Sequence, residues 1–254
     1  NVAPGSQNLF LQAIRTDTTT GACTSLFPSG SDVAIQVGAQ CNNPATCTQS
    51  VTLTTTSPAG NSGSFVPNGA FPATINFRFT TANAEAPFLF SYADAGQITL
   101  QFRAALPSPP AGVFVSGTSN AFVVRPFGLY LSGAGIPGVT GPGGAVFKKA
   151  GENFNVTAAA VAWQAGDDLN NDGVPDSGAN LSDNAVLPNF GQEAAPEGVT
   201  VTHTLVAPAG GSAGAITGGS FTGFAGGAKT NTMTWSEVGS ITLNAALTSG
   251  NYLG

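Results

Sequence analysis

Apolar and polar residues alternate with a period of two along many short segments of this chain. Residues 97–104 read QITLQFRA and residues 199–206 read VTVTHTLV, so that every second side chain, apart from His203, is apolar or small. Such alternation is typical of a β-strand that buries one face. No segment shows the sustained period of a helix. The pattern therefore predicts an all-β protein.

Clusters of Gly, Pro, Asn and Ser separate these alternating runs and are expected to form turns. The strands expected from the pattern are 9–16, 33–40, 50–56, 74–80, 97–104 and 120–125 in the first half, and 154–161, 199–206, 230–235 and 240–247 in the second. Six or seven short strands in about 120 residues are typical of an immunoglobulin-like β-sandwich.

One motif occurs twice, 143 positions apart. Residues 91–101 read SYADAGQITLQ and residues 234–244 read TWSEVGSITLN. Each copy contains an aromatic residue, an acid, a glycine and an Ile-Thr-Leu run that ends in a side-chain amide. Glycine is expected where the strand begins tightly, because it adopts a positive φ without steric cost. A repeat this long predicts two domains and not a solenoid.

Two weaker matches support the duplication. Residues 8–14 (NLFLQAI) resemble residues 153–159 (NFNVTAA), and the VTL and PAG of residues 51–60 resemble the TLV and PAG of residues 204–210. Because Pro126 would end a closing strand, we expect two tandem immunoglobulin-like sandwiches, 1–126 and 127–254.

The second unit is expected to lack its final strand. It stops at Gly254, shortly after the Ile-Thr-Leu run, whereas the first unit continues to a closing strand at 120–125. One interpretation, which we favour, is that the chain is a fragment of a longer protein. The alternative is that another chain supplies the missing strand by strand addition.

Composition excludes several classes of function. Only 8% of the 254 residues are charged, yet 42% are hydrophobic and 17 are Phe, which argues against disorder. A net charge of −6 with seven Lys and Arg disfavours binding to nucleic acid or anionic lipid. No apolar run reaches the roughly 18 residues of a membrane helix.

Low Lys content and loop cysteines indicate an extracellular or cell-surface protein. Because Asn1 is an unusual first residue, we expect that a signal peptide has been removed.

The acidic segment 167–176, DDLNNDGVPD, carries the most specific local signal. Oxygen-bearing side chains alternate before a glycine, and calcium prefers several such oxygens in one small loop. The expected ligands are Asp168, Asn170, Asp172, the carbonyl of Val174, and Asp176, with Asp183 or Asp167 completing the shell. The segment resembles the calcium loops of dockerins and thrombospondin type 3 repeats, although Ala179 replaces the glutamate of an EF-hand. The alternative is a solvated acidic turn.

The three cysteines are Cys23, Cys41 and Cys47. Cys41 and Cys47 bracket a turn-rich segment between two expected strands, and we predict a disulfide between them. Cys23 is expected to be free or bonded outside this chain. Zinc is disfavoured, because the one histidine is distant in sequence.

Signals for catalysis are weak. The single histidine, His203, shares a strand face with apolar residues, and no serine elbow occurs before a helix. Tyr92 and Trp235 precede the repeated glycine. They could form a platform on which a sugar stacks, although core packing is the more ordinary interpretation.

Four segments carry a resemblance to a known family. They are SYADAGQITLQFRA, SNAFVVRPFGLYLS, KKAGENFNVTAAAVAW and GVPDSGANLSDNAVLPNFGQE. These resemble the C-terminal β-rich domain family of MshQ-like bacterial surface proteins, which are encoded with mannose-sensitive haemagglutinin type IV pili. The resemblance implies a Gram-negative surface or pilus-associated protein, and it carries no catalytic signature. In that family the sequence continues beyond a segment like Tyr252-Leu253-Gly254.

Together these features predict a non-enzymatic structural or adhesive module of a pilus or another extracellular filament. The expected partners are other copies of the chain or other surface subunits, with a receptor or glycan as a further possibility. The alternative function is a carbohydrate-binding module of a larger secreted protein.

Overall fold

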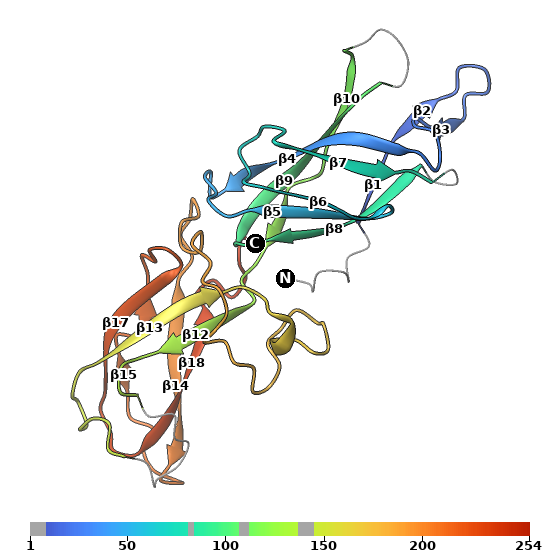
Figure 1. Cartoon of the computed structure of the whole chain (residues 1–254). Coiled ribbons are helices and arrows are strands. Elements are labelled where there is room, and N and C mark those ends of the chain that lie inside the picture. The colour runs from blue at the N-terminus through green and yellow to red at the C-terminus, as the bar shows by residue number, and fades with distance from the viewer. Residues whose placement is uncertain (1–8, 81–83, 107–111, 137–144) are drawn as a thin grey trace. The chain divides into compact units, whose positions relative to one another are not determined.

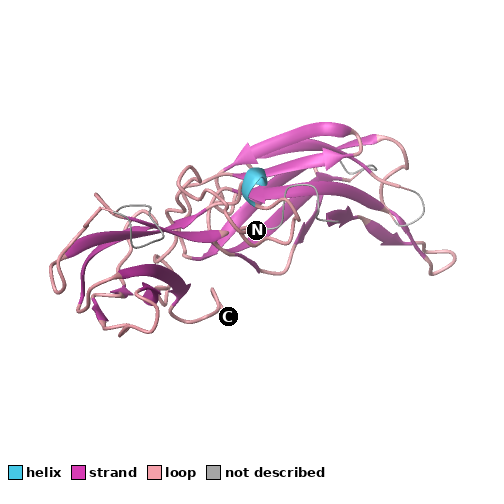
Figure 2. Ribbon diagram, turned by 90° about the horizontal axis from the view of Figure 1, so that it is seen from below, coloured by secondary structure: helices cyan, strands magenta, loops and turns pink. Residues whose placement is uncertain are grey.

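The structure is a computed structural model, and it describes residues 9–80, 84–106, 112–136 and 145–254. Strands dominate it, and within those ranges the only helical element is the short 3-10 turn η1 (Ala165–Asp167) (Figure 2). The chain separates into two compact units, Val2–Val124 and Arg125–Gly254 (Figure 1). The predicted all-β fold of two tandem units is confirmed.

The first unit is a sandwich of two antiparallel sheets. One sheet has the order β1-β8-β5-β6, and the other has the order β10-β9-β4-β7, with β11 also paired to β9. A separate hairpin joins β2 to β3. The strands are β1 (Leu9–Gln12), β2 (Ile14–Thr16), β3 (Cys23–Ser25), β4 (Asp32–Asn43), β5 (Val51–Thr56), β6 (Ala59–Phe65), β7 (Ala73–Arg78), β8 (Glu85–Tyr92), β9 (Gly96–Ala105), β10 (Phe114–Thr118) and β11 (Phe122–Val124).

An aromatic core joins the two sheets of the first unit. The ring of Phe77 on β7 lies 6.0 Å from that of Phe88 on β8 and 6.3 Å from that of Phe102 on β9, centroid to centroid. Both contacts are edge-to-face, an arrangement that aromatic quadrupoles favour. Val51 and Leu53 of β5 are fully buried in the same cluster. The period-two pattern of the sequence thus becomes the inner face of the sandwich.

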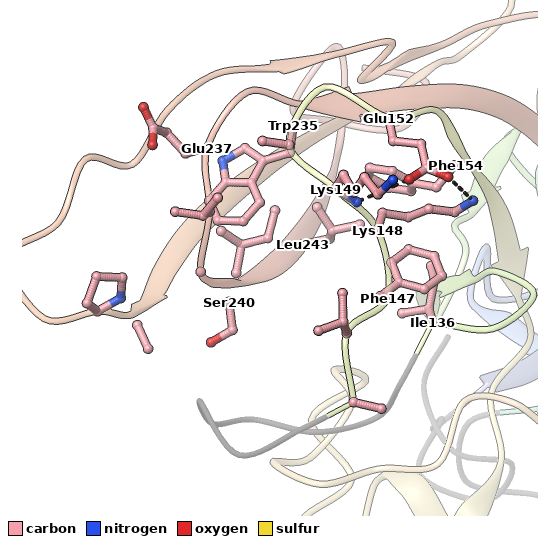
Figure 3. A pocket seen from close by; sticks show the side chains of 18 of the residues that line it. Ile136, Phe147, Lys148, Lys149, Glu152, Phe154, Trp235, Glu237, Ser240 and Leu243 are labelled. Atoms are coloured by element: carbon pink, nitrogen blue, oxygen red, sulfur yellow. Dashed lines mark hydrogen bonds and ion pairs between the residues drawn. The ribbon is translucent and has the colours of Figure 1, made fainter.

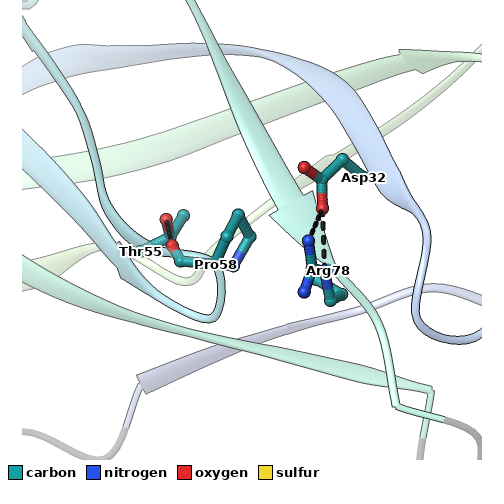
Figure 4. Close-up of polar contacts among 4 residues, drawn as sticks. All are labelled: Asp32, Thr55, Pro58 and Arg78. Atoms are coloured by element: carbon teal, nitrogen blue, oxygen red, sulfur yellow. Dashed lines mark hydrogen bonds and ion pairs between the residues drawn. The ribbon is translucent and has the colours of Figure 1, made fainter.

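Two polar contacts fix local geometry in this unit (Figure 4). At the start of the β4–β7 ladder, Arg78 forms an ion pair with Asp32, with nitrogen to oxygen 2.7 Å. Both side chains are substantially exposed, so this pair contributes little to stability. Thr55 is buried, and its hydroxyl donates to the Pro58 carbonyl at 2.6 Å. This bond satisfies a buried polar group inside the β5–β6 hairpin.

The second unit is also built from two antiparallel sheets, with the orders β12-β13-β17-β15 and β16-β14-β18. Its buried residues include Val156, Val201, Phe221 and Met233. The strands are β12 (Gly128–Ser132), β13 (Phe154–Val161), β14 (Val199–Ala207), β15 (Ile216–Thr217), β16 (Ser220–Phe221), β17 (Ala228–Trp235) and β18 (Ser240–Leu247). A long connection, residues 162–198, joins β13 to β14.

The two units share one topology. Chain order and pairing give two sets of matching strands. In one sheet, the order β13-β17-β15 matches β1-β8-β5. In the other sheet, the order β18-β14-β16 matches β9-β4-β7. The match of residues 8–14 with 153–159 is consistent with this, because β1 pairs with β8 as β13 pairs with β17. The first unit adds β6 beside β5 and adds β10 and β11 beside β9, whereas the second adds β12 beside β13.

The predicted match of residues 51–60 with 204–210 is wrong. A side chain on Gly239 would meet Pro208, and one on Gly96 would meet Pro44, so Pro208 corresponds to Pro44 and not to Pro58. The similarity is misleading because the same Pro-Ala-Gly sequence follows β5 in the first unit and β14 in the second.

Candidate functional site

A cleft of about 830 Å³ opens in the second unit beside the first half of β18 (Figure 3). The turn between β17 and β18 forms one wall, and the segment just before β13 forms another. Its size falls in the range of sites that hold small molecules or peptide side chains. The apolar lining comes from Phe147, Phe154, Trp235, Val238, Ile241 and Leu243.

Charged side chains stand at the rim of this cleft (Figure 3). The Lys148 ammonium donates to a Glu152 carboxylate oxygen at 2.9 Å, and the Lys149 backbone N–H donates to the other oxygen at 3.2 Å. These bonds lower the pKa of Glu152, with the Lys148 side chain as the largest cause. Glu237 also lines the cleft. The site therefore combines an apolar floor with a polar rim.

Trp235 is one of three half-buried aromatic side chains of the cleft, with Phe147 and Phe154. Its indole N–H donates to the Ala213 carbonyl at 2.8 Å, which fixes the ring. A ring nitrogen of His203 lies 2.8 Å from the same carbonyl oxygen, and His203 does not line the cleft. Tyr92, by contrast, is 6% exposed and belongs to the core of the first unit. Only Trp235 of this pair is placed where a sugar could stack.

The predicted calcium loop folds as a series of tight side-chain turns. The carboxylate of Asp168, which is 1% exposed, accepts the backbone N–H groups of Asp172 and Gly173 at 3.0 and 3.1 Å. The Trp163 indole N–H donates to Asp168 at 2.8 Å. The side chain of Asn170 accepts the Asp172 N–H at 3.0 Å. The side-chain oxygens of Asp168 and Asn170 therefore accept backbone N–H groups within one turn after η1.

The remaining predicted ligands lie on the same connection. Asp172 accepts the Val174 N–H at 2.8 Å, and Asp176 accepts the Leu169 N–H at 2.8 Å. The Asp183 side chain is exposed. Among the described residues no three His, Cys, Asp or Glu side chains form a group that could hold a metal. A calcium ion here would therefore depend on the Asn170 amide, the Val174 carbonyl and water as well as carboxylates.

The cysteine prediction is confirmed. Cys41 and Cys47 form a disulfide, with their Cα atoms 6.0 Å apart. The bridge closes the segment that follows β4. Cys23, on β3, is a free and exposed thiol.

Two buried glutamates, which sequence reasoning missed, anchor the last residues of the chain. Glu193 is 3% exposed and accepts the Tyr252 hydroxyl at 2.6 Å, and Glu197 accepts the hydroxyl of Ser249. Glu193 also accepts the backbone N–H of Gly191 at 3.1 Å. Neither glutamate lines the cleft. The available sequence signal was a pair of acids four residues apart in a segment of otherwise low charge.

Both units match the models of known domain families. Residues 1–118 match the first Ig-like domain of DUF6701, a domain of unknown function, and residues 125–234 match the second domain of DUF6701. The chain carries two DUF6701 domains. No curated protein and no solved structure matches it. The DUF6701 match agrees with the predicted immunoglobulin-like architecture, and it leaves the resemblance to MshQ-like proteins as a prediction. In the described parts of these domains, no helix has the length and apolarity needed to cross a membrane.

Proposed function

We propose that these DUF6701 domains form a non-enzymatic structural or adhesive module of a bacterial surface protein, such as a pilus or another extracellular filament. The observation that carries the proposal is the tandem of two sandwiches with one topology. Sandwich domains of this kind recur in cell-surface proteins, where the sheets serve as a rigid support for contacts made at loops and edges. The disulfide Cys41–Cys47 supports an oxidising location.

The proposal is tested on bacteria that carry the natural gene. We expect protease added to intact cells to degrade the protein, and gold-labelled antibodies to mark the cell surface or its filaments. Deleting the gene should reduce adhesion or filament number, and restoring it should recover them. Protection from protease until the cells are lysed would contradict the proposal, as would an unchanged surface in the deletion strain.

Carbohydrate binding is the second candidate, and the cleft is the observation that favours it. A half-buried Trp beside Lys148, Glu152 and Glu237 provides both a stacking face and hydrogen-bonding groups for a sugar. We expect glycan-array binding that Trp235→Ala abolishes. Trp163→Ala, which lies before the acidic loop and outside the cleft, is the matched control and should leave binding unchanged. An array without specific signals would remove this candidate.

We also propose that the loop 167–176 binds calcium and stiffens the long connection before β14. Saturating calcium at about 100 times its dissociation constant would raise the free energy of unfolding by about 2.7 kcal/mol. Calorimetric titration and thermal unfolding with calcium or chelator measure this effect. Asp172→Asn should remove it, whereas Asp17→Asn, in a turn of the first unit, should not. Absence of both binding heat and a melting shift would exclude calcium.

A further inference from the structure

The outer face of one sheet of the first unit carries a cation held between two aromatic rings. Arg103 lies on β9, which runs between β10 and β4 in that sheet (Figure 1). Its guanidinium carbon lies 4.4 Å from the centroid of the Phe71 ring and 4.8 Å from that of Phe114. Its Nε–H donates to the side-chain oxygen of Gln36 at 2.7 Å. Two cation–π contacts and one hydrogen bond therefore hold the guanidinium in place.

Strand register places Arg103 on the solvent side of its sheet. Gln36 of β4 and Ser116 of β10 are the residues that pair with Arg103. Its neighbours along β9, Phe102 and Ala104, are buried in the core of the sandwich. Because successive side chains of a strand point to opposite faces, the Arg103 side chain lies on the outer face with those of Gln36 and Ser116.

Phe71 reaches this face because the segment between β6 and β7 crosses over β4. A Cβ on Gly38 of β4 would collide with the Ala70 carbonyl oxygen, so a residue with a side chain would block the crossing. The Gly69 N–H donates to the Ala39 carbonyl of β4 at 2.9 Å. The backbone of β4 therefore anchors the segment that carries the Phe71 ring.

The positive charge of Arg103 has no acidic partner among the described residues. The two ion pairs found there use other cations, Arg78 and Lys148. Arg103 is half-buried, and a charge that is partly withdrawn from water is stabilised by an opposite charge. A guanidinium has five N–H donors, and the bond to Gln36 uses one of them. The two terminal nitrogens suit both oxygens of one carboxylate. A carboxylate ligand therefore fits this site.

The rest of this face favours a sugar as the carrier of that carboxylate. Exposed, uncharged hydrogen-bonding side chains surround Arg103. They are Thr74 and Asn76 of β7 and Ser116 and Thr118 of β10. Phe114 is 46% exposed, so part of its ring is available for a sugar ring to stack on. An acidic peptide that added as a strand would need a sheet edge for its backbone, whereas this site lies on a sheet face.

We propose that Arg103, held between Phe71 and Phe114, binds the carboxylate of a uronic acid in an acidic polysaccharide. The guanidinium pairs with the carboxylate, and the exposed part of the Phe114 ring packs against the sugar ring. This inference goes beyond the proposed function, because the site lies in the first unit and is separate from the cleft at Trp235. It does not depend on where in the cell the protein acts.

The test uses the full chain and a fluorescently labelled tetragalacturonate, which is a short oligomer of uronic acids. We expect saturable binding by fluorescence anisotropy that weakens as the salt concentration rises, because salt screens ion pairs at a surface. The same oligomer with its carboxylates methyl-esterified should bind about tenfold or more weakly, because the charge-assisted hydrogen bonds are lost.

Variants of the first unit locate the ligand. Arg103→Gln should weaken binding about tenfold or more, whereas Arg15→Gln, which removes an exposed cation from the β2–β3 hairpin, should not. Arg103→Lys keeps the charge but loses the planar pair of donors, so it should retain only part of the affinity. Thermal unfolding shows whether each variant is folded, and the esterified oligomer keeps the test valid if Arg103→Gln is not.

Several results would overturn the proposal. They are the absence of saturable binding, equal binding of the esterified oligomer, and equal effects of Arg103→Gln and Arg15→Gln. Equal binding of a labelled oligomer of glutamate would overturn the assignment to a sugar. Binding that Trp235→Ala removes and Arg103→Gln does not would place the ligand in the cleft and also overturn the proposal. The surface role is tested separately, by protease treatment of intact cells, and fails or stands on that result.

Discussion

At Gly96 and Gly239 the backbone adopts the same conformation, with φ +142° in both. A side chain would be strained there, and its Cβ would also lie 2.8 Å from the Asn43 carbonyl oxygen at Gly96 and 2.2 Å from the Ala207 carbonyl oxygen at Gly239. Both contacts are closer than Cβ atoms tolerate. The glycine of the repeated motif is therefore required by the neighbouring strand end as well as by the turn.

Gly96→Ala should lower the free energy of unfolding by about 1–3 kcal/mol, since it adds backbone strain and a collision with backbone. Chemical denaturation measures the change. Gly117→Ala is the matched control, because Gly117 lies in β10 and a Cβ there has no atom within 4 Å. Equal effects of the two substitutions would show that the close approach at Gly96 is unimportant.

The buried bond between Tyr252 and Glu193 defines a second test at this scale. Tyr252→Phe removes a hydroxyl that donates to a carboxylate and leaves that oxygen with one donor fewer, which should cost about 1–3 kcal/mol. Tyr130→Phe on the half-buried face of β12 should cost much less. Thermal unfolding followed by circular dichroism compares them. A Tyr252→Phe protein as stable as the wild type would contradict a structural role for this bond.

Sequence reasoning at the residue scale succeeded where the interaction is local. Cys41 and Cys47 are close in sequence, and the turn between them makes pairing geometrically available. The contact of Glu193 with Tyr252 joins residues 59 positions apart and depends on how the long connection folds. No local pattern encodes that path, so the sequence could not indicate that Glu193 contacts Tyr252.

At the scale of elements, period-two alternation located most strands well. The expected strands 154–161 and 240–247 coincide with β13 and β18. Four strands of the first unit were missed, and one of them, β3, has only three residues. β6 is composed mainly of small and polar residues, β8 contains Pro87, and β10 is exposed along its whole length. These strands form because neighbouring strands offer pairing partners, and that information is not present in their own residues.

The Cys41–Cys47 disulfide, at the end of β4, should stabilise the first unit by about 2 kcal/mol, because it closes a loop of a few residues in the unfolded chain. We expect the double variant Cys41→Ala with Cys47→Ala to lose this amount in urea unfolding. Both proteins should carry Cys23→Ser, so that the exposed thiol cannot form mixed disulfides. An unchanged urea midpoint would mean that the disulfide adds nothing to the stability that strand pairing gives the first unit.

At the scale of the whole molecule, the two units share one topology, but the repeated motif is more deeply buried in the first unit than in the second. The sequence repeat predicted the duplication, and the shared order of β1-β8-β5 and β13-β17-β15 confirms it. The repeat could not show that the apolar residues of the first copy are buried whereas those of the second copy are only half-buried. In the first unit this burial depends on β11, a short strand that pairs with the earlier strand β9. Burial of the motif therefore depends on the strands that surround it and not on its own sequence.

This difference should be measurable when the units are separated. The first unit, Val2–Val124, contains a complete buried cluster drawn from its own strands, so we expect it to fold alone and to unfold cooperatively. The second, Arg125–Gly254, should also fold and should bind an apolar fluorescent dye several times more strongly, because its cleft exposes an apolar lining. Ile241→Asp in the second unit should reduce dye binding, and Thr242→Asp should not. Equal dye binding by the two units would contradict an open sandwich, because both would then have cores closed to the same extent.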